Sequence, residues 1–181
     1  MRPERVIRYR AAAPGGVFEA RVEADPWRIL EAVEDSGALP AGPIVVPFAT
    51  WRARRDEISL RREPTGVWLA ADEDPLALGR DIHSLSLVAV NFPKLSDGRG
   101  YSSGVLIRQR LAYRGELRAF GDIGRDHLLM LSRCGFDAFS LPPTRDPEAA
   151  LAAFEGSSVR YQGSIDDPRP LFRRRFQGEA A

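Results

Sequence analysis

The stretch LSLVAVNF, residues 85–92, decides the fold. It is a nearly continuous apolar run, which is typical of a strand buried on both faces of a parallel sheet. After a glycine-containing loop comes SSGVLIRQRLAY, residues 102–113, which predicts a helix with Ser102 as its N-cap. A buried strand followed by a single helix predicts a βαβ unit.

The same alternation continues on both sides of this unit. The residue patterns predict strands at 43–48, 66–72, 116–122, 137–143 and 157–163, and helices at 49–63, 74–83, 124–136 and 146–156. Gly135 and Gly156 stand where helices end, and Asp146 and Pro147 where one begins. We therefore expect an α/β fold with a mostly parallel sheet of five or six strands, too few for a complete barrel of eight. An open layered sheet and an incomplete barrel-like sheet both fit, and we slightly prefer the open sheet.

The two ends of the chain differ from this regular middle. VIRYR and VFEARVE, residues 6–10 and 17–23, alternate apolar and polar residues and predict a small β-hairpin, while 26–37 has helical spacing that ends at Gly37. We expect an N-terminal segment over 1–24, an α/β domain over 25–163 and a basic tail over 164–181. The FRRRF motif of the tail fits either a solvated terminus or a docking segment.

Composition excludes several functional classes. With 26 Lys and Arg against 25 Asp and Glu, the charge is nearly balanced, which argues against a dedicated nucleic-acid binder. One cysteine and two histidines are too few for an internal disulfide, an iron–sulfur cluster or an ordinary zinc site. Neither a signal peptide nor a run of about 18 apolar residues is visible, so we expect a cytoplasmic protein without a membrane span. No flavin, nicotinamide or Walker motif is present, and we expect no bound cofactor or metal.

The loop NFPKLSDGRGYS, residues 91–102, is the first candidate site, because ligands of parallel sheets bind at the carboxyl ends of the strands. Gly98 and Gly100 allow close approach of another group, and Ser102 would direct the amides of a helix N-terminus toward the loop. Lys94 and Arg99 add positive charge, so the loop predicts a site for sulfate, sulfite, phosphate or a carboxylate. A tight turn whose charges are solvated or paired with Asp97 is the alternative.

Asp122 is the second candidate, since GDIGRD follows the strand predicted at 116–122. It is our candidate catalytic acid, base or orienting group. His127 we interpret as a partly exposed helix residue, and Cys134 as a packed hydrophobic residue. His83 precedes a strand and would lie at the opposite edge of the sheet.

The stretch FPKLSDGRGYSSGVLIRQRLAYRGELRAFGDIGRDHLLMLSRCGFDAFSL resembles the signature of the bacterial family known as domain of unknown function 934. DGRGYS, RGELRA, GD and RCGFDAF occur in the family's order, and the resemblance runs from about residue 30 to the last predicted strand. The departures from the family pattern lie at Leu95, Ser96, Ala112 (usually glycine) and His127 (commonly glutamine), all outside DGRGYS.

The resemblance implies a role in sulfite reduction. Members are described as oxidoreductases of this pathway, largely from gene neighbourhood with assimilatory sulfite reductase and phosphoadenylylsulfate reductase. We therefore expect an accessory protein or oxidoreductase that binds a sulfur oxyanion or a nucleotide phosphate at DGRGYS, with those two reductases as expected partners. The alternative is a non-catalytic scaffold of sulfite reductase, which would dock through the Arg-rich segment 50–62 or the tail.

Overall fold

The computed structural model describes residues 5–10, 19–31, 37–94, 97–155 and 163–165. Within these ranges the chain forms one eight-stranded sheet. The strands are β1 (Arg5–Arg10), β2 (Glu19–Ala24), β3 (Arg28–Ile29), β4 (Ile44–Pro47), β5 (Thr65–Leu69), β6 (Leu87–Phe92), β7 (Glu116–Gly121) and β8 (Ala138–Ser140). The helices are α1 (Phe48–Ala53), α2 (Arg55–Ser59), the 3₁₀ helix η1 (Pro75–Ser84), α3 (Arg99–Gln109), α4 (Arg125–Arg133), α5 (Pro147–Ala150) and the 3₁₀ helix η2 (Leu151–Ala153).

The sheet is mostly parallel and follows the chain in order. Its strand order is β2-β1-β8-β7-β6-β5-β4-β3. Every neighbouring pair from β3 to β8 is parallel, while β1 is antiparallel to both β8 and β2. The predicted hairpin therefore forms, and it extends the main sheet. Together with the short strand β3 it raises the number of strands above the five or six that the residue patterns predict.

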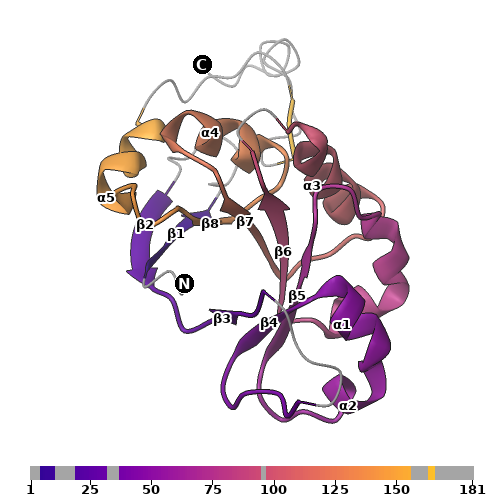
Figure 1. Ribbon diagram of the computed structural model, residues 1–181. Coiled ribbons are helices and arrows are strands. Elements are labelled where there is room, and N and C mark those ends of the chain that lie inside the picture. Colours follow the sequence, from indigo (N-terminus) through magenta and orange to yellow (C-terminus); the bar gives the residue numbers. More distant parts are fainter. Residues whose placement is uncertain (1–4, 11–18, 32–36, 95–96, 156–162, 166–181) are drawn as a thin grey trace.

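The sheet curls into a half-barrel, with the helices along its outer side (Figure 1). Only residues 25–27 join β2 to β3, which are the two edge strands. Four Cα steps span at most roughly 15 Å, whereas a flat sheet of eight strands is roughly 34 Å wide. The edges can be joined in this way only because the sheet bends back on itself, so our preference for an open sheet is wrong and the barrel-like alternative is correct.

Alternating residues divide the strands between two layers of core. In β6, Val88, Val90 and Phe92 face the helices and belong to the larger outer cluster. Leu87 and Ala89 face inward and pack with Trp27 of the segment that joins the edges. Continuous burial of this strand is therefore explained by apolar contacts on both of its faces.

A buried ion pair crosses the inner side of the half-barrel. Arg118 of β7 donates from Nη1 to Asp25 Oδ2 at 2.8 Å and from Nη2 to Asp25 Oδ1 at 3.2 Å, and neither side chain is exposed. Its Nε donates to Glu116 at 2.8 Å, and Asp25 also accepts from the backbone amide of Trp27. The residues that join the two sheet edges are thus held to the middle of the sheet.

The helix predicted over 26–37 is wrong in its described part. Arg28 and Ile29 pair with Ile44 and Val45 of β4 as a strand. Burial of the segment against the inner face outweighs its helical spacing, because local propensity is a weak determinant compared with tertiary contacts. Residues 32–36 lie outside the described residues.

Other predicted elements have shifted or interrupted boundaries. The helix over 49–63 is divided at Arg54 into α1 and α2, and the helix over 74–83 is a 3₁₀ helix with a kink at Gly79, whose φ is 56°. Gly135 follows α4 with a φ of 100°, as a helix-ending glycine should, and Asp146 caps α5 through its side chain. The strand predicted at 157–163 and Gly156 fall outside the described residues, apart from Gly163, which is in no strand.

No helix in the described ranges has the length and apolar character needed to span a membrane.

Candidate functional site

A pocket of about 390 Å³ lies at the carboxyl ends of β7 and β8, the edge at which parallel sheets usually bind ligands. Most of its lining is apolar, and Asp122 and Glu31 bring carboxylates to it. The lining residues are Ile29, Glu31, Phe120, Gly121, Asp122, Ser140, Leu141, Pro142 and Pro143.

Asp122 is positioned by the glycine before it. Gly121 has a φ of 103°, and a Cβ there would lie 2.4 Å from the carbonyl oxygen of Phe92. This close approach lets the amide of Asp122 donate to the same carbonyl at 2.7 Å. The Gly-Asp pair at the end of β7 therefore fixes the backbone of Asp122 against the end of β6 and directs its side chain to the pocket.

The partner of Asp122 comes from the loop after β8. Arg145 Nη2 donates to Asp122 Oδ1 at 3.0 Å, and the two side chains are 37% and 46% exposed. The guanidinium passes close to Gly124, where a Cβ would lie 1.6 Å from Nη1. An exposed pair of this kind contributes little to stability, so a bound ligand can replace either member at small cost.

The loop over residues 91–102, predicted to bind an anion, already holds the carboxylate of its own Asp97. Arg99 donates from Nε and Nη2 to the carboxylate of Asp97 at 3.0 and 2.7 Å, and its backbone amide donates to the same group at 3.2 Å. These hydrogen bonds lower the pKa of Asp97 to about 2. The Asp97 carboxylate thus lies where an external anion would be expected, at the start of α3.

Ser102 is not the N-cap of its helix. Helix α3 begins at Arg99, with Gly98 as N-cap, so Ser102 is an exposed residue inside the first turn. The early start depends on Gly100, where a Cβ would lie 2.5 Å from the ring of Phe92. Glycine lets α3 pack directly on the end of β6, and this contact was not visible in the residue pattern.

The predicted site residues are not brought into one pocket. Asp122 lines the carboxyl-edge pocket, whereas Lys94, Gly98, Arg99, Gly100 and Ser102 do not. Lys94 is exposed after β6. Since β6, β7 and β8 are adjacent and parallel, their loops still share one edge of the sheet. Anion binding by this group of residues stays a prediction.

Neither of the two histidines nor the cysteine lines the pocket that contains Asp122. His127 Nδ1 accepts a hydrogen bond from the amide of Gly124 at 3.1 Å at the start of α4. His83 is exposed in η1, and Cys134 is half-buried against the outer core. Among the described residues, no three His, Cys, Asp or Glu side chains are grouped as metal ligands would be.

Sequence reasoning missed Arg145 and Arg118. Arg145 lies in PPTRD, directly after a predicted strand, so its position was the available signal. Arg118 stands within the apolar strand ELRAF, and a charged residue at such a place indicates a buried partner, but nothing local indicates that the partner is Asp25, 93 residues away.

Comparison with known proteins identifies a family and no individual relative. Neither the curated proteins nor the solved structures include a match to the chain. One family model, described as a bacterial protein of unknown function, matches residues 66–172, which is more than half of the chain. The match includes β6 to β8 with the carboxyl-edge loops, and β5 except for its first residue. The chain therefore belongs to the bacterial family DUF934.

Proposed function

We propose that this protein is a cytoplasmic accessory protein or oxidoreductase of assimilatory sulfate or sulfite reduction that binds a sulfur oxyanion or a nucleotide phosphate at the carboxyl edge of its sheet. The pathway rests on the family resemblance described above. The binding site rests on one observation: the loops after three adjacent parallel strands carry Lys94 and Arg99, Asp122, and Arg145.

Ligand exchange is the mechanism that these contacts support. Arg99 and Arg145 each hold a carboxylate of the protein, and both side chains are accessible to water. A doubly charged oxyanion competes well for a guanidinium, because the planar donors can bind two of its oxygens. Its arrival would release Asp122 from Arg145 beside the apolar pocket, free to act as an acid, a base or an orienting group.

The partner protein is part of this proposal. An oxidoreductase that works on sulfite needs electrons from a separate carrier, which the complex would have to include. Sulfite reductase or phosphoadenylylsulfate reductase is the proposed protein partner. In the scaffold alternative the same partner would dock without any ligand. The Arg-rich segment offers limited support for docking, since Arg54, Arg55 and Arg61 all contact acids of the same chain.

A thermal-shift screen tests the proposal. The purified chain is heated with sulfate, sulfite, phosphate and adenosine phosphosulfates, beside Arg99→Ala, Arg145→Ala and the exposed control Arg62→Ala. We expect a ligand-dependent rise in Tm that both edge variants reduce and the control retains. No shift with any of these ligands would reject the binding site and favour the scaffold, which a pull-down with sulfite reductase would then detect.

A further inference from the structure

Strand β2 forms a free edge of the sheet. Among the described strands it pairs with β1 alone, and β3, at the other end of the strand order, does not pair with it. None of its six residues is buried. A strand with a free edge can add a strand from another chain through its outward backbone groups.

The register of the hairpin shows which backbone groups of β2 point outward. Tyr9 of β1 donates its amide to the carbonyl of Asp137, on the β8 side. Tyr9 lies opposite Ala20, so these two residues form a pair without hydrogen bonds to each other, and the backbone groups of Ala20 point away from β1. Val22 and Ala24 follow at intervals of two residues and direct their backbone groups the same way. The free edge therefore offers the amides and carbonyls of these three residues.

The side chains of β2 alternate between an apolar and a charged face. Ala20 and Val22 pack against the outer core, whereas Arg21 and Glu23 lie on the opposite face. Arg21 is the more accessible of the two charged side chains, with 60% of it exposed, and Glu23 is 36% exposed. The free edge thus presents one cation and one anion, two residues apart.

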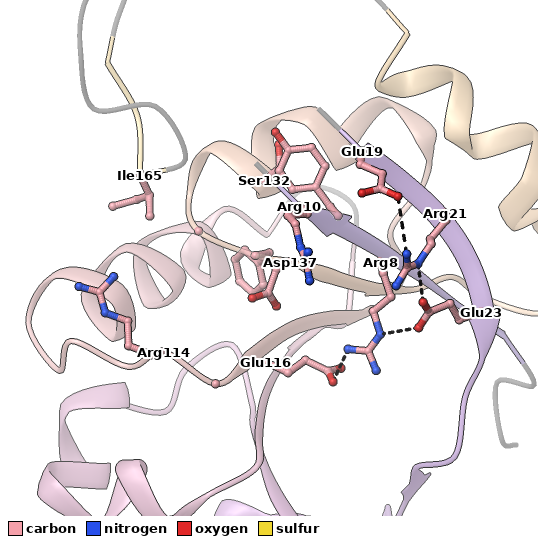
Figure 2. A pocket seen from close by; sticks show the side chains of 14 residues that line it. Arg8, Arg10, Glu19, Arg21, Glu23, Arg114, Glu116, Ser132, Asp137 and Ile165 are labelled. Atoms are coloured by element: carbon pink, nitrogen blue, oxygen red, sulfur yellow. Dashed lines mark hydrogen bonds and ion pairs between the residues drawn. The ribbon is translucent and has the colours of Figure 1, made fainter. Parts of the chain in front are cut away.

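Figure 2 shows that these two side chains end a row of alternating charge. Glu116 pairs with Arg8, Arg8 pairs with Glu23 at 3.5 Å, and Glu23 pairs with Arg21 at 2.5 Å. The row lies along a pocket of about 550 Å³ at the amino ends of β7 and β8, whose lining carries four arginines and four carboxylates. Because these charges balance, the pocket does not select a charged ligand, and the row is left to face a partner at the free edge.

We propose that β2 pairs with β2 of a second copy of this chain, antiparallel across a twofold axis at Val22, so that the two sheets join into one. In this register Val22 exchanges both of its outward hydrogen bonds with its own counterpart, and Ala20 pairs with Ala24. On the charged face Arg21 lies opposite Glu23 of the second copy, and the symmetry repeats this contact. The row of alternating charge then continues from one copy into the other.

The alternation of charge selects this register over its neighbours. Moving the axis by one residue would set Arg21 or Glu23 against its own counterpart, and like charges directly opposite destabilise a strand pair. Charged edge strands usually discourage pairing with other chains. In β2 the signs alternate, so the strand is complementary to an antiparallel copy of itself. This interface does not depend on the function proposed for the carboxyl edge.

Sedimentation equilibrium of the full chain tests the proposal. We expect a reversible equilibrium between monomer and dimer. Arg21→Glu and Glu23→Arg should each raise the Kd of the dimer about tenfold or more, because each reversal replaces two attractive contacts across the axis by two repulsive ones. Glu19→Arg is the matched control: it reverses a charge of the same strand beyond the paired residues 20–24 and should leave the Kd unchanged.

Mixing the two weakened variants tests the register directly. The Arg21→Glu chain presents two anions at the free edge and the Glu23→Arg chain presents two cations, so an equimolar mixture should dimerise about as tightly as the unmodified chain. A monomer at every concentration up to about 1 mM, or a dimer that both reversals leave unchanged, would overturn the interface. A mixture no tighter than either variant alone, or a dimer weakened by Glu19→Arg, would overturn the register. Circular dichroism confirms that the variants are folded.

Discussion

Two arginine–aspartate pairs in this protein have the same chemistry and opposite surroundings. Arg118 and Asp25 are 93 residues apart and fully buried on the inner side of the half-barrel. Arg99 and Asp97 are two residues apart, and the Arg99 side chain is 61% exposed. Each arginine contacts both oxygens of its aspartate.

The comparison separates what is visible in a sequence from what holds the fold. The Arg99 pair is part of a conspicuous glycine-containing motif, yet water can solvate both of its members when they separate. The Arg118 pair has no motif, yet it holds the segment that joins the two edges of the sheet. Burial removes the alternative of solvation, so losing one partner costs far more in the buried pair.

Asp25→Ala should cause the largest loss of stability. It leaves the guanidinium of Arg118 buried with Glu116 as its remaining charged partner, and we expect the free energy of unfolding to fall by about 3–5 kcal/mol. Urea unfolding monitored by circular dichroism measures this change. Asp97→Ala is the matched control and should shift the midpoint much less, because its partner Arg99 is 61% exposed and is solvated by water when the pair is lost.

The double variant Asp25→Leu with Arg118→Met sharpens the same comparison. Replacing both charges by apolar side chains leaves no buried charge without a partner, so we expect it to recover most of the lost stability. A double variant as unstable as Asp25→Ala would show that the hydrogen bond from the amide of Trp27 or the shape of the interior, and not the charge balance, is what Asp25 provides.

Ala112→Gly tests how much a local backbone conformation contributes to stability, for comparison with the long-range pair of Asp25 and Arg118. Ala112 has a φ of 51°, in the left-handed region. We expect the substitution to stabilise the protein by about 1 kcal/mol, because glycine adopts this conformation without the steric cost that a Cβ imposes. A loss of stability in urea unfolding would mean that the methyl group makes a contact worth more than the strain.

The ion pair between Arg99 and Asp97 should lower the pKa of Asp97 while it changes the free energy of unfolding only a little. Its pKa of about 2 lies below the ordinary value of about 3.9, because the side chain and the backbone amide of Arg99 donate to the carboxylate. Stability from this pair is therefore fully present above about pH 4 and is lost as the pH falls through 2. In Arg99→Ala, NMR titration should show the pKa of Asp97 returning toward 3.9; an unchanged value would assign the shift to the helix terminus.

Much of the architecture was predictable because it depends on neighbours in the sequence. The apolar run at 85–92 had to be a buried strand, and Gly135 and Asp146 mark helix ends through their own backbone and side-chain chemistry. The start of α3 was not predictable, since it depends on how closely Gly100 approaches the ring of Phe92. Strand β3 was missed for a similar reason: its pairing with β4 overrides a helical pattern.

In the candidate site, too, some features were predictable from nearby residues and others depended on tertiary contacts. The rule that ligands bind at the carboxyl ends of parallel strands placed Asp122 at an edge that does carry a pocket. Its contact with Arg145 required the loop after β8 to lie beside the loop after β7. A second pocket, lined by the hairpin and by the residues before β7 and β8, was not foreseen. The antiparallel joining of β1 to β8 is what brings the hairpin there.

The sequence by itself determined the α/β class, the parallel strands from apolar runs, the helix ends at Gly135 and Asp146, and the family, since all of these are carried by residues close together in the chain. Only the tertiary structure decided the curl of the sheet, the buried Arg118–Asp25 pair and the two charged edges. These features depend on which strands become neighbours. That choice is made by burial of both faces of the sheet and by the short segment that must join its edges, and no local pattern of residues records it.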